Sequence, residues 1–157
     1  MRRSDREITD FDEIVEIIKK CDVCRIALYD EEYPYILPLN FGMRIEDGKI
    51  VLYFHGANEG KKYALIEKNN KASFEMDCGH RLVMDDERMS CTMEYESVIG
   101  QGIIEKVPEE QKYDALMVLM RQYHQEDFPF NQQIMPQTTV LKLTVNSYTA
   151  KHRKTGK

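Results

Sequence analysis

Short apolar segments with strand character follow one another through tight turns along much of this chain. Segments 25–29 and 33–41 flank a polar turn and read as a hairpin, and segment 50–54 follows a turn of the Asp-Gly type. Three helical patterns separate groups of strands, over residues 10–20, 61–69 and 109–123. A doubly wound parallel sheet needs strand and helix to alternate throughout. This order instead predicts an antiparallel sheet that curls into a small barrel, mainly β with peripheral helices (α+β).

The second half of the chain supplies the remaining strands. Segment 138–147 has the clearest alternation of apolar and polar residues, and segment 71–77 alternates as well. Residues 91–107 predict a strand pair that bends at its glycines. The polar segment 81–89 predicts a loop, and residues 128–137, with two prolines, predict irregular structure.

Length and composition indicate one domain over residues 1–157. A chain of 157 residues with 42% hydrophobic residues supports a single compact core, and no repeat or flexible linker divides it. The net charge of -5 argues against general binding to nucleic acid. The most apolar stretch, 50–54, is far shorter than the roughly 18 residues of a membrane span, and the charged start is unlike a secretory signal. We therefore expect a cytoplasmic protein without nucleic-acid or membrane partners.

The cysteines point to reduced thiols more than to a metal site. Cys21 and Cys24 have the spacing of half a zinc site or of a redox pair, but Cys78 with His80 is a poor second half. Cys24 as a small core residue is the better interpretation, and we expect no metal. The roles of these three cysteines and of Cys91 stay open.

The segment 54–62, FHGANEGKK, is the most informative one for function. A strand runs through two glycines into the start of a helix, where backbone N–H groups lack partners and the helix dipole is positive. With Gly56 allowing close approach and His55, Lys61 and Lys62 as donors, these are the ingredients of a phosphate site. The spacing matches neither of the common glycine-rich nucleotide motifs. A solvated loop with two surface lysines is the alternative.

A second candidate is the aromatic segment 33–41, which contains Pro34 and Pro38. Proline cannot donate to a β-ladder, so this segment predicts an edge strand, a bulge, or a strand whose free backbone groups bind a flat ligand. By contrast, Ser97, Cys78 and Cys91 lack the local signature of a nucleophile. No catalytic residue is assigned.

Four segments together resemble the pyridoxamine 5'-phosphate oxidase-related flavoproteins, specifically their nitroimidazole resistance branch. They are REITDFDEIVEIIKKCDVCRIAL, YPYILPLNFGM, LYFHGANEGKKYALIEKNNKASFEMDCG and YESVIGQGIIE. The resemblance covers about residues 2–152, in the order typical of the family. It implies an FMN-binding split β-barrel that forms a homodimer with the flavin at the subunit interface.

The resemblance also implies roles for individual residues. In the glycine loop, it places His55, Lys61 and Lys62 at or beside the FMN phosphate. Along the isoalloxazine and ribityl chain it places Pro38, Leu39 and Asn40, largely through backbone groups. From the partner subunit it brings Tyr95, Ser97 and Val98 toward the flavin.

The function expected from this resemblance is flavin-dependent reduction, with nitroaromatic or nitroimidazole-like compounds as acceptors and a small electron donor such as NADH or NADPH. In such an enzyme the cofactor carries the chemistry, which agrees with the lack of a nucleophile or general base in the motifs. The alternative is a barrel dimer that stores or senses FMN, or haem, without turnover. Oxidation of pyridoxamine phosphate is less favoured, because the chain shows no basic cluster for a second phosphate.

Overall fold

A computed structural model describes residues 3–124, 126, 128–133 and 135–155, and within them the chain forms one antiparallel sheet of eight strands. The strand order is β3-β2-β6-β7-β8-β5-β4, and β1 also pairs with β8. The strands are β1 Glu7–Ile8, β2 Cys24–Leu28, β3 Tyr35–Leu39, β4 Phe41–Glu46, β5 Lys49–Ala57, β6 Lys71–Asp85, β7 Ser90–Lys106 and β8 Thr138–Arg153. The α-helices are α1 Phe11–Lys20, α2 Lys61–Lys68 and α3 Lys112–Tyr123. Three short 3-10 helices cover Ser4–Arg6, Glu109–Gln111 and Met135–Gln137.

The two ends of the sheet are joined at a single residue, Asn40. Strand β3 ends at Leu39 and pairs with β2, whereas β4 begins at Phe41 and pairs with β5 at the far end of the strand order. The chain therefore passes from one end of the strand order to the other across a single residue, and β3 and β4 are not paired with each other in the described ladders. This is the predicted mainly β, split-barrel α+β fold.

Helix α3 stabilises this junction. The Tyr123 hydroxyl accepts a hydrogen bond from the Phe41 N–H at 2.9 Å and donates to the Asp22 carbonyl at 2.8 Å. The Asn40 side-chain amide donates to the same Asp22 carbonyl at 3.2 Å. The backbone groups freed by the break in the ladder are thus partly satisfied by side chains.

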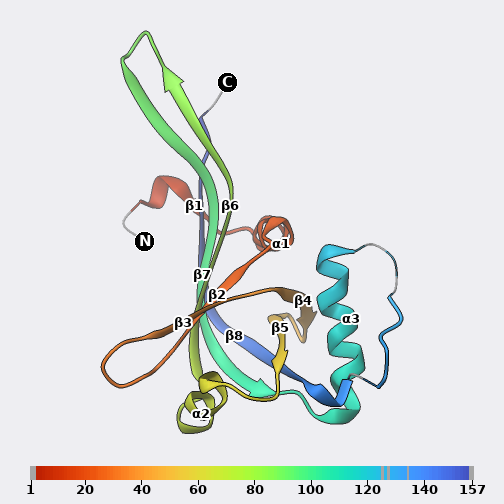
Figure 1. Ribbon diagram of the computed structural model, residues 1–157. Coiled ribbons are helices and arrows are strands. Elements are labelled where there is room, and N and C mark those ends of the chain that lie inside the picture. Colours follow the sequence, from red (N-terminus) through yellow and green to blue (C-terminus); the bar gives the residue numbers. More distant parts are fainter. Residues whose placement is uncertain (1–2, 125, 127, 134, 156–157) are drawn as a thin grey trace.

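The helices form as their patterns predict; α1 and α3 lie to one side of the long strands and α2 lies at their lower end (Figure 1). The Asp10 carboxylate caps α1 by accepting from the Glu13 N–H at 2.9 Å. The apolar face of α1 buries Ile14, Ile17 and Ile18 against the main core. A second apolar cluster lies between β5 and α3.

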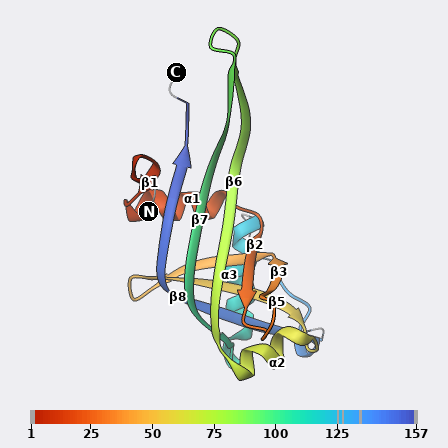
Figure 2. The ribbon, with the colours of Figure 1, turned by 90° about the vertical axis from the view of Figure 1, so that its left-hand side faces the viewer.

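Strands β6 and β7 continue well beyond the barrel as a two-stranded hairpin (Figure 2). We call residues 81–94 of this hairpin the arm. Its ladder runs from the Arg81–Glu94 pair to the Asp85–Ser90 pair, after a bulge that follows Cys78. The prediction of a loop over 81–89 is therefore wrong for 81–85, which form a strand, whereas 86–89 form the turn of the hairpin. Residues 81–85 form a ladder because the partner strand, and not a core, supplies their backbone hydrogen bonds.

Residues 91–107 form one strand and not the predicted strand pair. Strand β7 pairs with β6 from Ser90 to Ile103 and with β8 from Tyr95 to Lys106, and its irregularity at the glycines is a register shift against β8 between Gln101 and Gly102. Strand β8 also extends past the predicted end at Ser147, to Arg153, where Lys151 pairs with Glu7 of the unpredicted strand β1. Among the described helices, none is both long and apolar enough to cross a membrane.

Candidate functional site

The glycine loop connects β5 to α2 and leaves the start of the helix without a side-chain cap. Gly60 occupies the N-cap position with φ of 144°, in a region that side-chain-bearing residues rarely adopt. No hydrogen bond from a side chain caps this helix, and its first turn contains no acidic residue. The N-terminal donors of α2 are therefore available to an anion.

Side chains from three elements hold the loop in place. The Tyr63 hydroxyl, on α2, donates to the Ala57 carbonyl at 2.5 Å. The Asn58 amide donates to the Pro136 carbonyl at 2.7 Å and accepts from the Thr139 hydroxyl at 2.9 Å. The loop is thus organised by the chain itself, so little conformational freedom would be lost when a ligand binds.

The two lysines of the loop have different surroundings. The Lys61 ammonium forms an ion pair with Asp30 at 2.5 Å, and this hydrogen bond raises the pKa of Lys61. The Lys62 ammonium instead lies over the loop. A Cβ atom added at Gly56 would be 3.1 Å from it, and one added at Gly60 would be 3.5 Å from it. Lys62 therefore supplies the positive charge next to the two glycines of the loop, whereas Lys61 is already paired with Asp30.

Lys61 also connects the loop to the second predicted segment. Its ammonium lies 5.3 Å from the centre of the Tyr35 ring on β3. Strand β3 is the terminal strand of the sheet, as the prolines predicted, and β2 is its one ladder partner among the described strands. The outward edge of β3 thus carries unpaired backbone groups next to the start of α2.

The predicted residues on β3 agree with a role through the backbone. Pro38 is exposed on the strand, and Leu39 is half-buried against the core. The Asn40 side chain is used by the fold, since it donates to the Asp22 carbonyl. These positions can therefore contact a ligand mainly through backbone groups at the edge of the strand.

His55 is exposed but points away from the centre of the loop. Alternation along β5 puts it on the same face as Val51 and Tyr53, toward α3, whereas Gly56 lies on the opposite face. The structure thus brings Gly56 and Lys62 together and separates His55 from them.

The third predicted segment lies on β7 toward the arm, away from the glycine loop. Tyr95 is half-buried, and the Lys151 ammonium is 5.4 Å from its ring centre. Ser97 is 7% exposed, and its hydroxyl has no hydrogen-bond partner among the described residues. Val98 is fully buried in the main core of its own chain, so it offers a ligand no side-chain surface.

Cys24 is a buried core residue, as the sequence predicts, and Cys21 is buried as well. Cys24 and Cys21 belong to the main core, and burial raises the pKa of both thiols. Cys78 is half-buried, and Cys91 is exposed on the arm. Within the described residues, no three His, Cys, Asp or Glu side chains gather to hold a metal ion.

Comparison with known proteins places this geometry in a family. The family model described as pyridoxamine 5'-phosphate oxidase matches residues 10–152. The chain belongs to the pyridoxamine 5'-phosphate oxidase family. A crystal structure of a proposed 5-nitroimidazole antibiotic resistance protein from Bacteroides thetaiotaomicron is 32% identical. The match covers 93% of this chain and 86% of that one, with a TM-score of 0.81, and it agrees with the branch indicated by the sequence.

More distant structures share the fold. A FAD and haem binding protein from Mycobacterium smegmatis is 17% identical, with a TM-score of 0.80, over 96% of this chain and 74% of that one. The flavocytochrome Anf3 from Azotobacter vinelandii is also 17% identical, with a TM-score of 0.79, over 99% of this chain and 72% of that one. A comparison with curated protein sequences finds no match.

Three residues of the site region were not identified from the sequence. Asp30 forms an ion pair with Lys61. The Tyr63 hydroxyl donates a hydrogen bond to the Ala57 carbonyl, and the Tyr123 hydroxyl accepts one from the Phe41 N–H. Only Tyr63 carried a local signal, as an aromatic residue just behind the glycine loop. Asp30 and Tyr123 reach the site from elements distant in the sequence, and no local pattern reports such a contact.

Proposed function

We propose that this protein is a flavoprotein that binds FMN and catalyses reduction as a cytoplasmic homodimer. The observation that carries the proposal is the uncapped start of α2, with Gly60 at the N-cap and the Lys62 ammonium over the loop. One helix terminus, and one ammonium that lies 4.4 Å from the Tyr63 ring centre and has no ion pair among the described residues, fit a single phosphate monoester, which is what terminates FMN. Membership of the family and the flavin-binding proteins among its structural neighbours support a flavin.

The chain would hold the cofactor from two sides. Lys62 and the first N–H groups of α2 would bind the phosphate, and the absence of a side chain at Gly56 leaves room for the Lys62 ammonium, which a Cβ atom there would meet at 3.1 Å. The free edge of β3, at Pro38, Leu39 and Asn40, lies along the ring system and supplies backbone groups. When bound, a flavin accepts hydride and passes electrons to an acceptor, so the protein needs to orient and shield it. Its nitroimidazole resistance relative supports nitroaromatic compounds as acceptors.

The first experiment compares how FMN, riboflavin and FAD bind to the purified protein and to two single variants. Lys62→Ala should raise the Kd for FMN by roughly tenfold or more, because a charge-assisted contact contributes about 1.5–3 kcal/mol. The same change should leave the Kd for riboflavin, which has no phosphate, nearly unchanged. Lys61→Ala is the matched control and should weaken FMN less, because Lys61 is paired with Asp30. Equal losses for FMN and riboflavin would remove the phosphate assignment.

The second experiment tests turnover. Anaerobic NADH or NADPH should bleach the absorbance of the bound flavin, and a nitroimidazole should restore it. A flavin that stays oxidised with both donors would exclude the reductase and leave a binding module.

A further inference from the structure

The arm concentrates sulfur-containing side chains. Segment 84–93, MDDERMSCTM, contains three of the nine methionines of the chain and one of its four cysteines. Met76 shows the usual place of a methionine, since it is fully buried in the main core. On the arm, by contrast, the exposed fractions are 63% for Met84, 89% for Met89 and 48% for Met93, and the cysteine is exposed as well. Packing within the chain therefore does not account for these four sulfur residues.

The register of the arm brings three of the sulfur residues to one side. Met84 on β6 lies directly opposite Cys91 on β7. Met93 follows Cys91 by two residues along β7 and therefore shares its side of the strand. Side chains directly opposite each other start about 5 Å apart, and diagonal neighbours such as Met84 and Met93 start about 7–8 Å apart. The long, flexible side chain of methionine can span both separations, so the three sulfur atoms can meet at one point.

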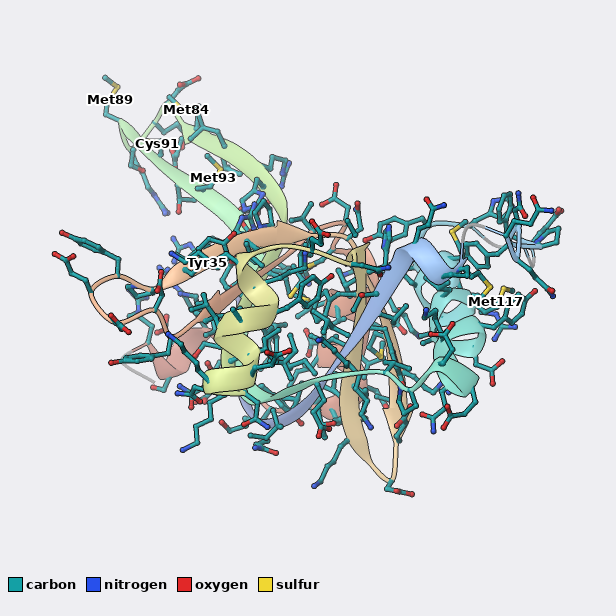
Figure 3. The ribbon with its side chains drawn as sticks, turned by 60° about the horizontal axis from the view of Figure 1, so that its bottom comes forward. Tyr35, Met84, Met89, Cys91, Met93 and Met117 are labelled. Atoms are coloured by element: carbon teal, nitrogen blue, oxygen red, sulfur yellow. The ribbon has the colours of Figure 1, made fainter. Side chains whose placement is uncertain are left out.

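Met89 adds a fourth sulfur atom from the turn at the tip of the arm. Its φ of 50° lies in the left-handed region, which glycine and asparagine adopt far more readily than methionine. A long apolar side chain thus occupies an unfavourable backbone position and is exposed to water there, a combination that points to a role outside packing. Figure 3 shows Met84, Met89, Cys91 and Met93 together on the protruding hairpin, far from the body of the molecule.

The opposite side of the arm is polar, so the sulfur residues are separated from the charged ones. Arg81 donates to the Glu94 carboxylate at 2.8 Å, and the same carboxylate accepts from the Thr155 N–H at 2.7 Å. Ser90 and Thr92 alternate with the sulfur residues of β7 and therefore face this polar side. The arm thus has one side built for hydrogen bonds and one side rich in sulfur.

Thioether and thiolate groups bind a restricted class of metal ion. They are soft ligands that select Cu(I), whereas carboxylate and carbonyl oxygens suit Mg²⁺, Ca²⁺ and Mn²⁺. Zn²⁺ is bound by thiolate, imidazole and carboxylate groups, and no three such side chains gather within the described part of the chain. The sequence-based expectation of no metal was argued from cysteine and histidine spacing, which does not test methionine as a ligand.

We infer that the sulfur side of the arm binds one Cu(I) ion through the Cys91 thiolate and the thioethers of Met84, Met89 and Met93. When the ion binds, the Cys91 thiol releases its proton to water, so the charges of the thiolate and of Cu(I) cancel. The copper enters as Cu(I), so no electron is transferred.

Binding would also stabilise the arm. The ligands come from both β6 and β7, and a two-stranded hairpin without a core is only marginally stable in water. An ion held by both strands favours their paired state by mass action. This site goes beyond the proposed function, because the glycine loop lies before β6 begins, at the opposite end of that strand from the arm.

The charge of the tip favours a cation. The turn contains Asp86 and Glu87, while Arg88 forms an ion pair with Asp85 at 3.7 Å. Two carboxylates therefore leave the turn with a net negative charge, which attracts a positive ion toward the sulfur residues.

The first test is an anaerobic competition titration in which Cu(I) is supplied as its bicinchoninate complex. Loss of the absorbance of that complex reports transfer of copper to the protein, and the wild-type chain should take up one equivalent. Cys91→Ser should raise the Kd by roughly 100-fold, and Met84→Leu with Met93→Leu by roughly tenfold, because leucine keeps the apolar volume but removes the sulfur. Cys78→Ser, at a half-buried thiol, and Met117→Leu on α3 are matched controls and should leave the Kd unchanged. Circular dichroism checks that each variant is folded.

The second test identifies the ligands by NMR of protein labelled with ¹³C in the methionine methyl groups. Ag(I) is the probe, because it shares the preference of Cu(I) for sulfur and does not change its oxidation state. One equivalent should shift the methyl signals of Met84, Met89 and Met93. The signal of Met117, on the other side of the molecule from the arm (Figure 3), should stay in place.

Three results would overturn the inference: no transfer of Cu(I) from bicinchoninate, an affinity indifferent to the loss of Cys91 or of the two thioethers, or equal shifts of the Met117 signal and of those on the arm. An equal concentration of Zn²⁺ that displaces the copper would also exclude a site selective for soft metals. None of these results bears on the proposed function, because flavin titration of Lys62→Ala reports on the glycine loop alone.

Discussion

The two halves of the β6–β7 hairpin have the same backbone pairing but opposite surroundings. In the barrel half, Phe74, Met76, Val98 and Ile104 are buried against the core. In the arm, one side carries exposed apolar residues and the other a polar network centred on Glu94. Packing against the core thus stabilises the barrel half, whereas cross-strand hydrogen bonds and charged contacts stabilise the arm. A strand can therefore form without a core of its own when it is hydrogen-bonded to an ordered partner strand.

Disturbing the packing of the barrel half should destabilise the protein most. A Cβ atom at Gly102 would lie 2.1 Å from the Thr144 carbonyl oxygen, and backbone atoms there cannot move aside. Gly102→Val should therefore lower the free energy of unfolding by about 3 kcal/mol, as measured by urea denaturation. Ser90→Ala on the exposed arm is the control. A small loss for Gly102→Val would mean that the barrel half is not tightly packed.

A smaller effect should come from the polar network at the base of the arm. Hydrogen bonds from the Thr155 hydroxyl and N–H and from Arg81 lower the pKa of Glu94 from its ordinary 4.5 to about 2. Since the pKa is lower in the folded state, the stabilisation is fully present above about pH 5 and is lost as the pH falls toward 2. Glu94→Gln should flatten the pH dependence of stability, and of proteolysis of the arm, over this window. An unchanged pH profile would show that the network does not hold the arm.

The smallest effect concerns the exposed side of the arm. Met84→Ala should change the free energy of unfolding of the subunit by at most about 0.5 kcal/mol, because Met84 is largely exposed in the single chain. The measurement is urea denaturation of the Met84→Ala variant beside the wild-type chain. A loss like that of a core residue would show that the arm packs on its own subunit, which would erase the contrast.

The same contrast explains which parts of the fold the sequence predicts. The barrel strands are predictable because one side of each faces the main core, and burial imposes alternation, as in Leu141, Leu143 and Val145. The sequence predicts a loop over residues 81–89 because these residues face no core, so their composition resembles that of a turn. The extension of β8 to Arg153 was missed for the same reason, since the partner strands β1 and β7 hold it there.

For the candidate site, the glycine loop, the edge strand that contains Pro38, and the family can all be predicted from the order of residues along the chain. These depend on local features: glycine at positive φ, proline without an N–H, and a characteristic order of motifs. The folded chain is needed to see that Lys62 lies over the loop while Lys61 is paired with Asp30, and that Val98 lies in the main core whereas Ser97, also buried, does not. Such choices depend on contacts between residues far apart in the sequence, and two adjacent lysines carry no information about which of them has a distant partner.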